Sequence, residues 1–338
     1  MNIPAAAITA VLSFGITALL GFVAIPALKK LKFGQTILDI GPAWHKSKNG
    51  TPTMGGVMFI AGVIISFAAG IAILWASGAI KLDATGSQQL IKAISAVIMA
   101  VLFGFIGFVD DFIKVKKKRN EGLTPIQKII MQVLVIAAFF TSRIISGDTS
   151  TTIDFPFLGQ LDLWYFYYII MGLGILYLVN AVNLTDGVDG LCSSVTLVYC
   201  GAYIVICSLV GMQEMGLVAA AAGAGCLGFM VWNLHPAKVM MGDTGSMFLG
   251  GIVTAVGIGT GTEFIMVICC AIYIWEALSV LIQMTYFKIT HGKRLFKMTP
   301  IHHSFEIRGW KEGKIVAVFS LLELLACSVG IALQYFGV

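Results

Sequence analysis

Long apolar runs alternate with short polar segments along the whole chain. A helix needs roughly 20 residues to cross about 30 Å of hydrocarbon, and ten runs approach or exceed that length. They lie at 3–27, 54–76, 92–112, 125–146, 163–182, 190–210, 215–232, 245–262, 264–287 and 315–336. The pattern predicts an all-α integral membrane protein of about ten transmembrane helices, formed by a single domain, 1–338. The connection 147–162 is long enough for a small hairpin.

Composition and charge agree with this class and orient the chain. Hydrophobic residues make up 58% and charged residues 12%, where a soluble domain has about 25% charged. Eighteen of the 22 Lys and Arg residues lie in loops that follow odd-numbered helices. The positive-inside rule places these loops in the cytoplasm and both termini outside. The net charge of +5 therefore reflects membrane orientation, and no nucleic-acid partner is expected.

The unusual polar stretches all fall on the side predicted to be cytoplasmic. They are "KNGTPTMGG" (48–56), "DDFIKVKKK" (110–118), "NLTDGVDG" (183–190), "NLHPAKVMMGDTGS" (233–246) and "KMTPIHHSFE" (297–306). The active site is therefore expected at the cytoplasmic face, where a soluble ligand and a lipid headgroup can meet.

Acidic residues in these loops indicate a metal and a phosphorylated ligand. Five aspartates stand in three connections: Asp110, Asp111, Asp186, Asp189 and Asp243. Carboxylates opposite a surplus of lysine suit a hard divalent cation, and Mg²⁺ typically takes one or two carboxylates and completes its shell with water and phosphate oxygens. The glycines of "GTPTMGG" and "MGDTGS" predict helix mouths whose backbone N–H groups can meet an anion.

Other titratable residues leave alternatives open. His302 and His303 are expected to contact phosphate or handle a proton, since a zinc site would need more ligands and this face has no cysteine. Glu276 and Glu323 lie inside predicted spans, where a charge is costly and often functional. They keep an ion-coupled carrier as an alternative, although a carrier would concentrate its polar groups at the bilayer midplane.

The motifs "VDDF", "NLTDGVDGL", "MGDTGS" and "PIHHSFE", together with "GTPTMGG", resemble those of the phospho-N-acetylmuramoyl-pentapeptide-transferases. These belong to the polyprenyl-phosphate N-acetylhexosamine-1-phosphate transferase superfamily, and the resemblance runs from about residue 44 to 312. It implies Mg²⁺-dependent transfer of the phospho-sugar from UDP-MurNAc-pentapeptide to undecaprenyl phosphate, giving lipid I and UMP in peptidoglycan synthesis. It also implies a homodimer in a bacterial cytoplasmic membrane. The runner-up is a related enzyme that moves GlcNAc-1-phosphate onto the same lipid.

The resemblance also assigns site residues. The catalytic set is Asp110, Asp111, Asp243, His302 and His303, with Asp243 as the Mg²⁺ ligand. The substrate-binding set is Lys48, Thr53, Lys114, Lys118, Lys128, Asn183, Asp186, Gly187, Asp189 and Met240. Of Asp110 and Asp111, one is expected near the metal and the other at the lipid phosphate. Direct attack by that phosphate is favoured over a covalent aspartyl intermediate.

The chain departs from the family pattern at two positions. Met240 stands where the family commonly has Phe, so stacking on uracil, worth ~1–3 kcal/mol per base, is lost or supplied by another side chain. Ser304 stands where the family often has a third histidine. This departure puts in doubt only the role of that third side chain.

Overall fold

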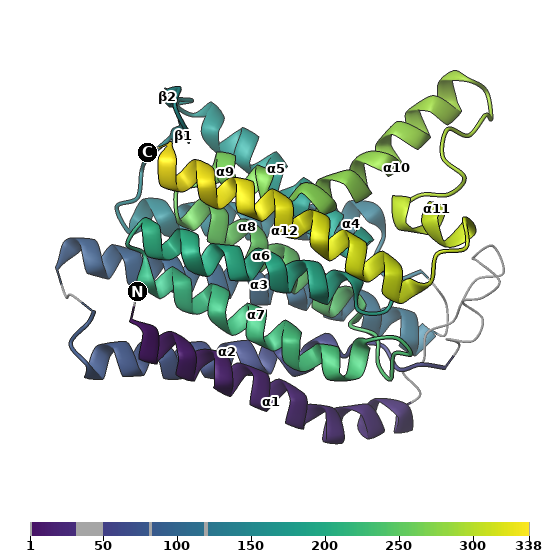
Figure 1. Ribbon diagram of the computed structural model, residues 1–338, viewed down its shortest axis with the longest axis horizontal. Helices are drawn as coiled ribbons and strands as arrows, with labels where there is room; N and C mark the ends of the chain where they lie inside the picture. The colour runs from purple at the N-terminus through teal and green to yellow at the C-terminus, as the bar shows by residue number, and fades with distance from the viewer. Residues whose placement is uncertain (1, 32–49, 81–82, 118–120, 338) are drawn as a thin grey trace.

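The computed structural model describes residues 2–31, 50–80, 83–117 and 121–337, and it is a bundle of helices (Figure 1). Its elements are α1 (Ile3–Lys30), α2 (Gly56–Ala76), α3 (Ala84–Lys117), α4 (Pro125–Ile145), β1 (Thr152–Phe155), β2 (Gly159–Asp162), α5 (Phe166–Thr185), α6 (Leu191–Leu209), α7 (Gln213–Asn233), α8 (Gly242–Gly259), α9 (Glu263–Ile268), α10 (Ala271–Ile289), α11 (Ile301–Ile307) and α12 (Glu312–Phe336). Within the described ranges, eight helices are long and apolar enough to cross a membrane. The class of integral membrane protein is therefore confirmed.

Nine of the ten predicted spans each correspond to one helix, whereas the prediction of a single helix over 264–287 was wrong. The run 264–287 forms α9 and α10, which are separated at Cys269 and Cys270. The carboxylate of Glu323 on α12 accepts a hydrogen bond of 3.0 Å from the backbone N–H of Ile272. This bond satisfies one of the N–H groups that the start of α10 leaves without an intrahelical partner. The short helix α11 was also missed, whereas the expected hairpin is present as β1 and β2.

The helix α8 lies in the interior of the bundle, and every residue from Thr244 to Gly259 is buried. Glycine lets its neighbours approach closely. A Cβ atom at Gly107 of α3 would overlap the backbone of Asp243, and one at Gly56 of α2 would overlap Gly245 of α8. Small residues at such crossings are how membrane helices bring their backbones together. The close crossing of α3 and α8 positions the candidate site.

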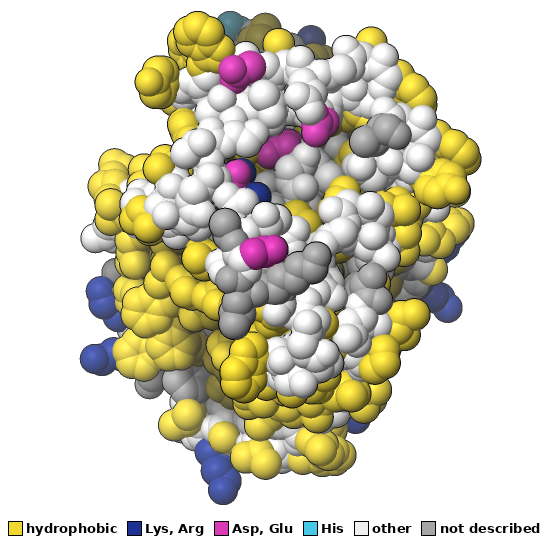
Figure 2. Space-filling view, turned by 90° about the vertical axis from the view of Figure 1, so that its left-hand side faces the viewer, with side chains coloured by type: hydrophobic (Ala, Val, Ile, Leu, Met, Phe, Trp, Pro, Cys, Tyr) yellow, Lys and Arg dark blue, Asp and Glu magenta, His cyan; other side chains and the backbone are white. Residues whose placement is uncertain are grey.

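The two ends of the bundle differ. Both termini and the hairpin lie at one end, whereas α11 and the C-terminal end of α10 lie at the other (Figure 1). Seen end-on from the termini, apolar side chains cover the flanks and a few charged groups lie in a central hollow (Figure 2).

A buried ion-pair network joins three helices on the terminal side of the bundle. Nε of Arg143 lies 2.7 Å from Asp148, and Nζ of Lys92 lies 3.1 Å from the same carboxylate. Arg143 also donates to the hydroxyl of Tyr167 at 3.0 Å. Burial alone would raise the pKa of Asp148, but the charge and hydrogen bond of Arg143, helped by Lys92, outweigh it and hold the pKa below its ordinary value. The network therefore links α3, α4 and α5.

Candidate active site

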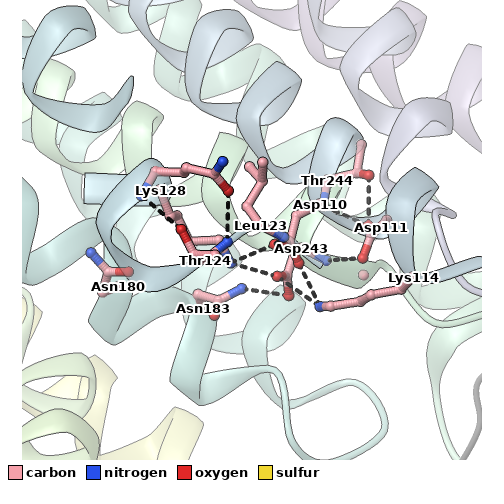
Figure 3. A network of polar contacts seen from close by, with 12 residues as sticks. Asp110, Asp111, Lys114, Leu123, Thr124, Lys128, Asn180, Asn183, Asp243 and Thr244 are labelled. Atoms are coloured by element: carbon pink, nitrogen blue, oxygen red, sulfur yellow. Dashed lines mark hydrogen bonds and ion pairs between the residues drawn. The ribbon is translucent and has the colours of Figure 1, made fainter. Parts of the chain in front are cut away.

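Three carboxylates meet where α3 ends and α8 begins (Figure 3). Asp110 and Asp111 project from α3, which continues past its predicted end at 112 as far as Lys117. Asp243 projects from the first turn of α8. One oxygen from each of the three lies within 4.8 Å of the others. Asp110 and Asp111 are buried, whereas the side chain of Asp243 is 20% exposed. The three aspartates that the sequence predicted to share one site therefore lie close together.

Two lysines lie between Asp110 and Asp243. Nζ of Lys128 is 2.8 Å from Oδ2 of Asp243, and Nζ of Lys114 is 3.1 Å from the same oxygen. Lys114 also lies 2.6 Å from Asp110, and Lys128 lies 3.6 Å from it. Asp110 in addition accepts a hydrogen bond of 2.8 Å from the backbone N–H of Leu123. The site thus contains one more carboxylate than ammonium group.

Asp111 has a different role from Asp110, because it faces the N-terminus of α8. Its Oδ2 accepts hydrogen bonds from the N–H of Thr244 at 2.9 Å and from the Thr244 hydroxyl at 2.7 Å. Its Oδ1 accepts from the N–H of Asp243 at 3.3 Å. The residue before α8, Met241, makes no side-chain cap of its own. Asp111 is therefore an N-cap supplied by another helix, and its negative charge complements the positive end of the helix dipole.

The N–H groups of the two glycine motifs have partners within the protein: in "MGDTGS" those of Asp243 and Thr244 meet the Asp111 carboxylate, whereas the prediction of an anion was wrong for Gly55 and Gly56 of "GTPTMGG". Gly55 and Gly56 donate their N–H groups to the carbonyls of Met240 and Met241 at 2.9 and 3.0 Å. Gly242 has a φ of +71°, and a Cβ atom there would meet Asp111 and the hydroxyl of Thr53. Thr53 therefore lies at the entry to α8.

Asn183, at the end of α5, completes the surroundings of Asp243. Its Nδ2 donates to Oδ1 of Asp243 at 3.0 Å and to the hydroxyl of Ser246 at 2.8 Å. The donor set of Asp110 and Asp243 consists of hard carboxylate oxygens, which is the chemistry that Mg²⁺ prefers. These residues therefore fit a Mg²⁺ ion, while Asp111 is already committed to α8.

The two histidines of α11 lie beside glutamates. His302 is fully buried, and its Nδ1 lies 3.0 Å from Oε2 of Glu276, which is also fully buried. Its Nε2 faces Gly187, where a Cβ atom would overlap the ring. His303 packs on His302 with 4.1 Å between ring centroids, and its Nδ1 lies 2.6 Å from Glu306. His302 thus joins α11 to α10 and to the loop after α5.

Sequence reasoning missed this partner of His302. It took Glu276 as a possible carrier residue, since an acid inside an apolar run was the available signal. The partner lies 26 residues away across an irregular loop, so no periodicity connects the two. The second such acid, Glu323, is occupied with the start of α10.

The remaining predicted residues are spread more widely. Asp189 accepts a hydrogen bond from the N–H of Ala237 at 3.0 Å, and its Oδ2 lies 3.1 Å from Nδ1 of His235. With Glu312 these residues form a second group that could hold a metal, separate from the Asp243 group. Asp186 ends α5. Met240 is 7% exposed. Lys48 and Lys118 lie outside the described residues.

Comparison with known proteins gives first the class and then the family. Residues 93–261, half of the chain, match the model of Glycosyl transferase family 4. This range contains all three carboxylates, so the fold and site define a membrane-embedded transferase of that family. Residues 48–60 also match signature 1 of phospho-N-acetylmuramoyl-pentapeptide-transferase.

Full-length relatives narrow the assignment. The chain is 42% identical over 325 residues to the phospho-N-acetylmuramoyl-pentapeptide-transferase of Clostridioides difficile strain 630, covering 96% of each protein. It is 39% identical over 328 residues to that of Halalkalibacterium halodurans, covering 97% of each. For Listeria monocytogenes strain EGD-e the identity is 39% over 314 residues, with 92% and 93% covered. The chain belongs to the phospho-N-acetylmuramoyl-pentapeptide-transferase family.

Proposed function

We propose that the chain transfers phospho-N-acetylmuramoyl-pentapeptide from its UDP derivative to undecaprenyl phosphate, which gives lipid I and UMP. The observation that supports this most directly, in a member of this family, is the meeting of Asp110, Asp111 and Asp243 beside Lys114 and Lys128. A reaction between two phosphates depends on fixed geometry and on neutralisation of charge. Carboxylates for a metal and lysines for phosphate oxygens can supply both.

The carboxylates divide the work in this proposal. Asp243 is the Mg²⁺ ligand, and Asp110 is the second carboxylate within reach. When bound, Mg²⁺ supplies positive charge against the diphosphate and the transferred phosphoryl group. Asp111 acts through α8, because its bonds to Thr244 fix the turn from which Asp243 projects. Asp111 is therefore a positioning residue in this account.

The lysines and Asp110 are proposed to handle the phosphates. Lys114 and Lys128 would turn from Asp243 to phosphate oxygens, which offer them several strong acceptors. The acceptor phosphate has a second pKa near 6, so at neutral pH it is largely ionised and needs orientation more than deprotonation. Asp110, paired with both lysines, is the candidate for this orienting role in a direct attack.

The other residues assigned by resemblance remain proposed contacts of the substrates or of the loops around them. They are Lys48, Thr53, Lys118, Asn183, Asp186, Gly187, Asp189, Met240, His302 and His303. For His302, complete burial favours a role in holding the loop of Gly187, and His303 is the better candidate for contact with substrate.

The membrane arrangement is part of the proposal. The chain acts as one domain, 1–338, with ten crossings, in which α8 is one and α9 with α10 another. Both termini lie outside, and the site faces the cytoplasm of a bacterium from its inner membrane. The positive-inside rule supports this orientation, because it assigns eighteen basic residues to the side of the membrane on which Asp110 and Asp111 are predicted to lie. The working form is a homodimer.

UMP release by the purified protein tests the reaction. With undecaprenyl phosphate and Mg²⁺, turnover is expected with UDP-MurNAc-pentapeptide as donor. Turnover with UDP-GlcNAc alone would replace the proposal by the GlcNAc-1-phosphate transferase. The ion-coupled carrier has no observation in its favour, because Glu276 and Glu323 both have partners within the protein.

A further inference from the structure

The C-terminal half of α10 departs from the bundle, and the chain returns beside it toward α11 (Figure 1). Between the helix and the returning segment lies a hollow of about 450 Å³. Its lining includes three cations, Lys288, Arg294 and Lys297, and three apolar side chains, Met284, Phe287 and Met298. The hollow contains none of the residues proposed above for the transfer reaction.

The walls of this hollow are held in place by hydrogen bonds. Oε1 of Gln283 on α10 accepts from the backbone N–H groups of Leu295 and Phe296 at 3.0 and 2.9 Å. The hydroxyl of Ser304 donates to the carbonyl of Met298 at 2.5 Å and accepts from its N–H at 3.2 Å. The returning segment is thus fixed to α10 at one point and to α11 at another. Ser304, the departure from the family's third histidine, has a structural role here.

The charge of the hollow is unbalanced. Among the described residues, no carboxylate forms an ion pair with Lys288, Arg294 or Lys297. By contrast, Lys114, Lys128 and Arg143 each form at least one ion pair. Three like charges around one cavity repel each other. An anion with several oxygens, such as a phosphate, relieves this repulsion and accepts hydrogen bonds from all three side chains.

The surface next to the cations is apolar. Along α10 the side chains of Leu281, Met284, Phe287 and Ile289 are 50, 53, 45 and 71% exposed. In a membrane protein such a surface contacts lipid chains, and a basic pocket at its end suits an anionic headgroup. Free phosphate would use only the cations, whereas a phospholipid would use both surfaces.

We propose that this hollow binds the phosphate of an anionic phospholipid, with the acyl chains lying along α10. The lipid comes from the leaflet on the side proposed above to be cytoplasmic. The site is distinct from the transfer centre and does not depend on the identity of the donor.

Retention of lipid by the purified full-length protein tests the proposal. The protein is incubated in detergent with equal amounts of phosphatidylglycerol and phosphatidylcholine, and the bound lipid is counted by native mass spectrometry. The triple variant Lys288→Gln, Arg294→Gln, Lys297→Gln is compared with Lys29→Gln, Lys30→Gln, a control that removes lysines from the end of α1 on the same side. Wild type and control are expected to retain phosphatidylglycerol selectively.

The triple variant should lose this selectivity by about fivefold for each cation, from ~1 kcal/mol per basic residue at a membrane surface. An unchanged preference in the triple variant, or an equal loss in the control, overturns the proposal. If the triple variant does not fold, Lys288→Gln alone should show the fivefold step.

Two further arms identify the source of the phosphate. Excess inorganic phosphate should not displace phosphatidylglycerol; full displacement would mean that the cations bind any phosphate, and the lipid assignment would fail. In detergent with phosphatidylcholine alone, the triple variant should keep the wild-type KM for the UDP donor. A raised donor KM would assign the hollow to the donor instead. Because lipid retention is measured without substrates, a failed transfer assay would not affect this test.

Discussion

Replacement of Asp111 by asparagine separates the capping role of this residue from a metal-binding role. Asparagine is nearly isosteric, so packing is kept, but the side chain loses its charge and one of its two acceptor oxygens. In the wild type these oxygens accept from the N–H and hydroxyl of Thr244 at 2.9 and 2.7 Å and from the N–H of Asp243 at 3.3 Å. The side-chain amide of the variant would point an N–H donor at one of these donors.

The cost can be worked from these contacts. A hydrogen bond to a charged group is worth roughly 1 kcal/mol more than one between neutral groups. The loss of an anion at a partly buried helix N-terminus costs up to ~2 kcal/mol. Removal of the cost of burying the Asp111 charge, and relief of its repulsion with Asp243, offset part of this. We therefore expect Asp111→Asn to destabilise the protein by ~2 kcal/mol and to reduce turnover as well, because the turn that holds Asp243 shifts.

The matched control is Asp243→Asn, which makes the same chemical change on the next carboxylate. The two lysines that pair with Asp243 also pair with Asp110, so they keep a carboxylate partner in this variant, and the loss of stability should be smaller than the loss of the α8 cap. Unfolding temperature in detergent and UMP release are measured for both variants. Both should lose turnover, but Asp111→Asn should unfold at the lower temperature. If Asp111→Asn unfolds at the wild-type temperature, the capping role is wrong.

Three further variants test other parts of the site. Asp110→Asn should be nearly inactive at saturating Mg²⁺ while losing less stability than Asp111→Asn, since the asparagine oxygen can still accept the N–H of Leu123; wild-type turnover would refute its assignment. Glu276→Gln should reduce turnover about tenfold, because the bond to His302 weakens by ~1–2 kcal/mol; an unchanged rate would count against this pairing. Gly187→Ala should lower turnover or raise the donor KM, because the new Cβ overlaps the His302 ring, and the added substitution His302→Ala should restore part of the loss only if the clash is the cause.

Hydropathy predicted most of the fold, because the membrane thickness imposes a length on each apolar run. It failed at the break between α9 and α10, where Cys269 and Cys270 are neither Pro nor Gly. One N–H group at the break is satisfied by Glu323, which lies 51 residues further along the chain. A contact of that separation leaves no trace in local periodicity.

The sequence indicated which residues belong to the candidate site but not which of them contact one another. Charge patterning and motif order predicted that Asp110, Asp111 and Asp243 lie near one another, and their carboxylates do lie close together. The distinction between Asp110 and Asp111 was not predictable, because adjacent residues on a helix point about 100° apart and only the packing decides which one faces α8. The same holds for the N–H groups of the glycine motifs, which the protein uses itself.

The position of a bound divalent ion tests the central claim most directly. Crystals of the protein are grown with Mn²⁺ in place of Mg²⁺, and the anomalous signal of Mn²⁺ locates any bound ion. The account predicts an ion in coordination contact with Asp243, with Asp110 within reach and Asp111 still bonded to Thr244. An ion found only at Asp189, His235 and Glu312, with none at Asp243, would contradict it.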